Sequence, residues 1–216
     1  MLMNNAPPLQ GSWTLTGGIC GVMAVLAYFG AAFVPLPGTA SLILAFAFGP
    51  LVSIASLGLV RALEQGTPHV GVRVAGFLGA SAGITVLAML SVQQALFAAQ
   101  ADIPEADPSR AALIALSDAV HFGLDIAWDC LIAASITLFA IRFWRVSAFG
   151  KALSVMGTLC GAGLFAVNMA AFPDPPESIG MLDMGPLCAL WMLVVYGWML
   201  RVGAAARPSG ASAGRH

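Results

Sequence analysis

Six long apolar segments constrain this chain more than any other feature of its sequence. They cover roughly residues 13–33, 40–60, 73–99, 112–142, 149–171 and 184–202. A helix needs about 20 apolar residues to cross a hydrocarbon core about 30 Å thick. Each segment therefore predicts one transmembrane helix. The chain as a whole predicts an all-α, polytopic integral membrane protein with six transmembrane helices.

The composition excludes the main alternatives to a membrane protein. Of the residues, 59% are hydrophobic and only 9% are charged, whereas a soluble domain carries about 25% charged residues. No basic stripe is present, so nucleic acid is not an expected partner. No connecting stretch is long enough to fold alone. We therefore expect a single domain over 1–216, in contact with the lipid bilayer, with a flexible cytoplasmic tail at 203–216.

The charged residues predict the orientation in the membrane. Eight of the nine Lys and Arg residues fall in or beside the second connection, the fourth connection and the C-terminal tail, and Arg110 is the exception. The positive-inside rule places these segments, and with them both termini, in the cytoplasm. The three acidic connections then face outward. The expected architecture is three helical hairpins in the cytoplasmic membrane of a bacterial cell.

Three of the predicted helices carry two glycines four residues apart. Small residues at this spacing let two helix backbones approach closely in lipid. We interpret them as packing positions within the chain, with a contact to a second copy or to a membrane-complex partner as the alternative. Segments 17–21 and 157–161 are also similar, which raises the hypothesis that the first and last hairpins form a parallel repeat. The three pairs are Gly17/Gly21, Gly79/Gly83 and Gly157/Gly161.

The stretch SDAVHFGLDIAWDC, residues 117–130, is unusually polar for a membrane segment. At 100° per residue, Asp118, His121, Asp125 and Asp129 share one face of the fourth helix. A charged side chain at the bilayer centre costs at least about 2.5–3.5 kcal/mol, so intramembrane acids are treated as candidates for a functional site. The alternative is a buried hydrogen bond that fixes helix packing.

Other helices supply polar residues at a similar depth. Counting from the outer helix ends places Tyr28, Gln93 and Asn168 in the outer half, whereas the inner half offers only Ser, Thr and Cys. We therefore predict a polar pocket that opens outward. Asp125 and Asp129 would bind the occupant, His121 would tune them, and Asp118 would attract cations at the mouth.

Three functions are compatible with such a pocket. The leading hypothesis is transport of a cation, a proton or a small polar solute. The first alternative is a non-catalytic accessory or scaffold subunit of a membrane complex, and the second is a membrane-embedded enzyme with an Asp/His site. Oxygen and imidazole ligands also suit a metal ion. One helix face rarely completes a coordination sphere, however, so no metal, cofactor or catalytic residue is assigned.

Overall fold

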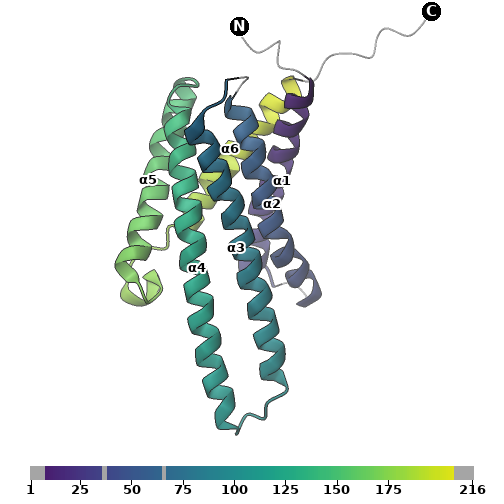
Figure 1. The fold of residues 1–216 in the computed structure, drawn as a ribbon, viewed down its shortest axis with the longest axis vertical. Helices are drawn as coiled ribbons and strands as arrows, with labels where there is room; N and C mark the ends of the chain where they lie inside the picture. Colours follow the sequence, from purple (N-terminus) through teal and green to yellow (C-terminus); the bar gives the residue numbers. More distant parts are fainter. Residues whose placement is uncertain (1–7, 36–37, 65–66, 207–216) are drawn as a thin grey trace, which may run out of the picture.

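A computed structural model describes residues 8–35, 38–64 and 67–206, which form an all-helical protein (Figure 1). The elements are α1 (Pro8–Phe33), α2 (Gly38–Glu64), α3 (Val70–Ala101), α4 (Pro108–Phe143), α5 (Ala148–Ala171), the short 3-10 helix η1 (Pro176–Ile179) and α6 (Gly185–Ala205). These ranges contain no strand. The expected all-α class is confirmed.

The outer surface of the bundle is apolar. Each of the six α-helices in the described residues is long and apolar enough to cross a membrane. Phe77, Ile84 and Leu159 are 66–70% exposed. An apolar surface of this extent requires an apolar environment. The protein is therefore a multi-pass membrane protein whose outer surface contacts lipid.

The helices extend beyond the apolar segments at several ends. α3 begins at Val70 rather than near 73, and α4 begins at Pro108 rather than near 112. A polar residue interrupts an apolar segment of the sequence, but the helix can continue through it. Its side chain can reach the membrane interface or cap the backbone. Asp107 caps α4 by accepting a hydrogen bond from the Ser109 N–H at 2.8 Å. Hydrogen bonds from Ser109 hold the pKa of the Asp107 carboxyl below its ordinary value.

The C-terminal boundary also differs from expectation. α6 continues to Ala205, so the first three residues of the expected tail are helical. Ala204 and Ala205 favour continuation of the helix, because alanine has the highest helix propensity. Residues 207–216 of the expected tail lie outside the described residues.

Neighbouring helices along the chain pack side by side, with one exception. Each helix from α1 to α4 packs along the next one in the chain. α6 instead packs mainly against α1, and it contacts α5 and α2 over shorter stretches. In Figure 1, α6 crosses behind the bundle from α5 toward α1. The first and last hairpins therefore pack differently, and the similarity between 17–21 and 157–161 is not matched by a repeated packing arrangement.

The two ends of the bundle differ in charge. α1 begins and α6 ends at the same end, where a Cβ added at Gly11 would lie 3.0 Å from the Cβ of Ala206. The α2–α3 and α4–α5 connections lie at this end too. We call it the basic end, and its basic residues are Arg61, Arg73, Arg142, Arg145, Lys151 and Arg201.

The opposite end, the acidic end, carries Asp102, Glu105, Asp107, Asp174 and Asp183. Here α3 and α4 project beyond the other helices (Figure 1). The 36 residues of α4 correspond to a length of about 54 Å, and the 21 residues of α6 to about 32 Å, at 1.5 Å per residue. The α3–α4 hairpin is therefore longer than a hydrocarbon core of about 30 Å requires.

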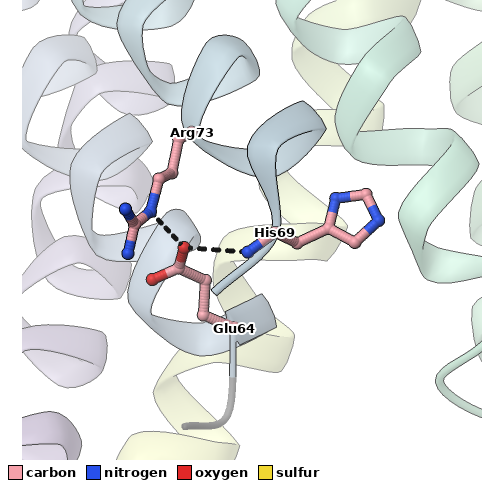
Figure 2. A network of polar contacts seen from close by, with 3 residues as sticks. All are labelled: Glu64, His69 and Arg73. Atoms are coloured by element: carbon pink, nitrogen blue, oxygen red, sulfur yellow. Dashed lines mark hydrogen bonds and ion pairs between the residues drawn. The ribbon is translucent and has the colours of Figure 1, made fainter. Parts of the chain in front are cut away.

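Polar contacts join α2 to α3 at the basic end. The buried carboxylate of Glu64 accepts a hydrogen bond from the Arg73 guanidinium at 2.7 Å and another from the His69 backbone N–H at 3.3 Å (Figure 2). Glu64 thereby satisfies an N–H at the start of α3, which a helix cannot satisfy from within its first turn. These contacts tie the end of α2 to the start of α3.

The predicted glycine pairs pack within the chain. All six glycines are buried. A Cβ added at Gly17 would lie 2.6 Å from Gly58 Cα, one at Gly79 would lie 2.8 Å from Ser135 Oγ, and one at Gly157 would lie 2.6 Å from Trp191 Nε1. These contacts agree with the interpretation of the pairs as intramolecular packing positions. A seam between copies through the same glycines stays a prediction.

Candidate functional site

A cavity of about 220 Å³ lies among α1, α2, α4, α5 and α6, toward the acidic end. We call it the acidic pocket. Pro175, Pro176 and Asp183 of the α5–α6 connection contribute to its wall, so the pocket is nearest to the acidic end of the bundle. Its other polar lining residues are Tyr28, Asp125, Asp129, Asn168 and Cys188.

Three carboxylates converge on the acidic pocket. Asp125 and Asp129 lie four residues apart on α4, so they project from one face of that helix. Asp183 comes from the α5–α6 connection and accepts a hydrogen bond from the Gly185 N–H at 2.7 Å. Tyr28, on α1, is within electrostatic range of all three carboxylates. One helix and one connection thus bring three carboxyl groups to one volume.

Asn168 holds one of these carboxylates in place. Its amide nitrogen donates to Asp129 Oδ2 at 2.8 Å and to the Leu164 carbonyl at 3.0 Å, and Asn168 itself is buried. The contact joins α4 to α5 across the pocket wall. Because Asn168 is buried and its amide is also tied to Leu164, the hydrogen bond restricts the orientation of the half-buried Asp129 carboxylate.

Replacing Asn168 by leucine is expected to lower the free energy of unfolding by about 1–2 kcal/mol, because the Asp129 carboxylate loses its amide donor. The measurement is unfolding in mixed micelles, followed by circular dichroism. A double-mutant cycle with Asp129→Leu isolates the pair. A coupling free energy near zero between the two positions would contradict the proposed role of Asn168.

The rest of the acidic pocket is apolar and partly aromatic. Phe48 and Trp128 form part of the wall, with Tyr28 beside them. The remaining apolar lining includes Val25, Ala189 and Leu164, with Ile132 and Met192. Pockets that bind small molecules commonly combine an apolar lining with a few convergent polar groups.

The acidic pocket ends toward the basic end at Ile132 and Met192. These two residues also line a second void of about 10 Å³, which lies among Ser56, Ser135 and Tyr196. The Ser135 hydroxyl donates to the Ala75 carbonyl at 2.8 Å. The void is close to the smallest volume that holds one water, about 10–15 Å³. Packed side chains therefore separate the acidic pocket from the basic end.

The predicted site residues divide into two groups. Asp125, Asp129, Asn168 and Tyr28 line the acidic pocket together. Asp118, His121 and Gln93 lie outside its described lining: Asp118 is exposed, and the other two are half-buried. Asp118 is seven residues from Asp125, or about 10 Å along α4 toward the projecting tip.

His121 has a different environment from the one expected. Its ring packs edge-on against Phe122, with 5.8 Å between ring centroids, and its Nδ1 is buried without a hydrogen-bond partner. His121 lies one helical turn from Asp125 toward the acidic end, beyond the described lining of the pocket. Helical spacing showed that the two residues share a face of α4, but it did not show where along that face the pocket ends.

Sequence reasoning missed Asp183, Phe48 and Trp128. Asp183 belongs to the last of the three acidic connections, which the sequence predicts to face outward as a whole, and the two aromatic residues carry no signal beyond their apolar segments. The signal in the sequence was the position of Asp183 close to the start of α6, because so short a length of chain keeps it near that helix. In the described part of the chain, no three His, Cys, Asp or Glu side chains are grouped so that they could hold a metal ion.

Comparisons with protein-family models, with curated proteins and with solved structures found no match to this chain.

Proposed function

We propose that this protein is a small membrane transport protein that takes up a cation through the acidic pocket. The observation that carries the proposal is the convergence of Asp125, Asp129 and Asp183 on one cavity inside a membrane-spanning bundle. The described lining of that cavity includes no Lys, Arg or His. Carboxylates in a partly desolvated cavity favour a positively charged occupant, because its charge offsets their mutual repulsion.

The charge distribution supports an orientation for the transport protein. The positive-inside rule places the basic end, and both termini, in the cytoplasm. The acidic pocket then opens toward the outer side of a bacterial cytoplasmic membrane. Acidic residues of the outer connections would raise the local concentration of cations near the pocket.

The floor of the pocket supports transport over static binding. Ile132 and Met192 close the route toward the basic end, and only a void of about 10 Å³ lies directly beyond them. A transporter that works by alternating access has its site accessible from one side while packed helices close the other. The packing of Ile132 and Met192 is the arrangement expected of the outward-open state of such a transporter.

The proposal is tested by uptake into proteoliposomes of two probes, rubidium and methylammonium. We expect at least one probe to enter faster than into protein-free vesicles. Asp125→Asn and Asp129→Asn are each expected to reduce the initial rate by roughly tenfold or more, because loss of a nearby opposite charge removes more than about 1.4 kcal/mol of attraction. Asp118→Asn is the matched control, since it removes an exposed carboxylate of the same helix.

Two results would overturn the proposal. If neither probe entered faster than into protein-free vesicles, cation transport would be rejected as the function. If uptake stayed at the wild-type rate in both Asp125→Asn and Asp129→Asn, the acidic pocket would be rejected as the transport route. Asp118→Asn is expected to stay within about twofold of the wild-type rate, because screening by water weakens its effect on the pocket.

A further inference from the structure

Three aromatic side chains from three helices form one wall of the acidic pocket. Tyr28 of α1 and Phe48 of α2 have ring centroids 5.9 Å apart, and Phe48 and Trp128 of α4 have centroids 5.5 Å apart. All three residues line the same cavity as Asp125 and Asp129. We call this row of rings the aromatic wall. An aromatic face attracts cations through its quadrupole, and tryptophan does so most strongly.

The position of the aromatic wall is held by close packing of α2. Phe48 is buried, and the next residue, Gly49, packs directly against the backbone of Gly83 in α3. The Ser53 hydroxyl, one turn further along α2, donates to the Ala80 carbonyl at 3.0 Å. α2 therefore has little room to shift relative to α3, so Phe48 presents a fixed surface between Tyr28 and Trp128.

The grouping of acidic side chains favours one class of cation. Calcium and magnesium ions need several oxygen ligands within about 2.0–2.6 Å of the ion. No grouping of three or more acidic, histidine or cysteine side chains in the described residues meets this need. An organic ammonium ion has a diffuse charge and apolar substituents, so it can contact carboxylates and aromatic rings on different sides at once.

We propose that the acidic pocket selects a small organic ammonium ion over a metal cation, with Tyr28, Phe48 and Trp128 as the surface that recognises it. The inference rests on the proposed function and names its substrate class. The cavity of about 220 Å³ is smaller than the roughly 300–1,000 Å³ of pockets that hold drug-sized ligands, so the ion is small. The carboxyl oxygens of Asp125, Asp129 and Asp183 attract its charge.

The test compares binding of tetramethylammonium and rubidium to the full-length protein in detergent, by isothermal titration calorimetry. Trp128→Leu and Phe48→Leu are each expected to weaken tetramethylammonium binding roughly threefold to thirtyfold and to leave rubidium binding unchanged. Trp128→Phe keeps an aromatic face and is expected to have an intermediate effect. Trp144→Leu, at the basic end of α4, is the matched control and is expected to bind as the wild type does.

The outcomes separate this inference from the proposed function. Binding of rubidium but not tetramethylammonium would overturn the ammonium assignment and leave cation transport standing. Equal tetramethylammonium affinity in the wild type, Trp128→Leu and Phe48→Leu would also overturn the role of the aromatic wall. Binding of neither ion would count against the proposed function, and the inference would fall with it. Circular dichroism of each variant establishes that it is folded, and Trp128→Phe tests the wall if Trp128→Leu does not fold.

Discussion

Replacing Trp191 by alanine is expected to lower the free energy of unfolding by about 2–4 kcal/mol. Trp191 is buried, its Nε1 donates to the Leu153 carbonyl at 2.8 Å, and its ring meets that of Phe143 edge-on with 6.3 Å between centroids. α5 and α6 contact each other over only a short stretch. The loss of Trp191 therefore removes packing from the least extensive contact between consecutive helices.

The expected magnitude follows from the membrane environment. Truncating a buried Trp to alanine in a water-soluble core costs about 3–5 kcal/mol, part of it from exposure of apolar surface to water in the unfolded state. In a bilayer or a micelle the separated helices face hydrocarbon rather than water. The cost of the substitution then comes mainly from the lost packing and the cavity. The free energy of unfolding is measured in mixed micelles by circular dichroism.

Two further variants sharpen the test at Trp191. Trp191→Phe retains most of the ring but loses the bond to Leu153, so we expect a loss of about 0.5–1.5 kcal/mol. Trp13→Ala removes a Trp that is 51% exposed, and we expect a smaller loss from it than from Trp191→Ala. Equal losses from Trp13→Ala and Trp191→Ala would contradict the assignment of Trp191 as a packing residue between α5 and α6.

Replacing Gly58 by leucine is expected to prevent α1 and α2 from packing together. A Cβ at Gly58 would lie 2.6 Å from Gly17 Cα and 3.2 Å from the Trp13 carbonyl oxygen. These are backbone atoms, which can move away only if the two helices separate. Overpacking costs about 1–3 kcal/mol where side chains can adjust, so a rigid backbone contact is expected to cost at least the upper part of that range.

The measurement for Gly58→Leu is the yield of monodisperse protein on size exclusion in detergent, followed by the unfolding midpoint. Gly197→Leu is the matched control, because a Cβ at that position of α6 meets nothing within 4 Å. We expect Gly197→Leu to keep the wild-type yield and midpoint. A wild-type midpoint for Gly58→Leu would show that the α1–α2 contact tolerates a larger separation than the structure has.

The fold was predictable from the sequence to the level of helices and their order. Segments near 40–60 and 149–171 became α2 and α5, with ends that moved by a few residues. The reason is that a membrane helix must satisfy its backbone hydrogen bonds internally, so apolar length alone predicts it. Helix ends were less predictable, because residues such as Asp107 can cap a helix or precede it.

The candidate site was predictable only in part. Helical periodicity placed Asp125 and Asp129 on one face of α4, and depth counting selected Asn168 and Tyr28, all of which line the acidic pocket. Depth counting also selected Gln93 of α3, which lies outside the described lining. Depth along a helix does not specify rotation about its axis relative to its neighbours, and that rotation decides which side chains face a cavity.

By itself, the sequence determined that the chain has six membrane-spanning helices, that most of its basic and acidic residues gather at opposite ends, and that four polar residues share a face of α4. Only the tertiary structure decided that Asp183 and the aromatic wall join Asp125 and Asp129 around one cavity. The physical reason is that membrane helices associate through close packing at contacts such as that of Gly17 with Gly58. These contacts depend on the shapes of two helices together, and the hydropathy along one helix does not predict them.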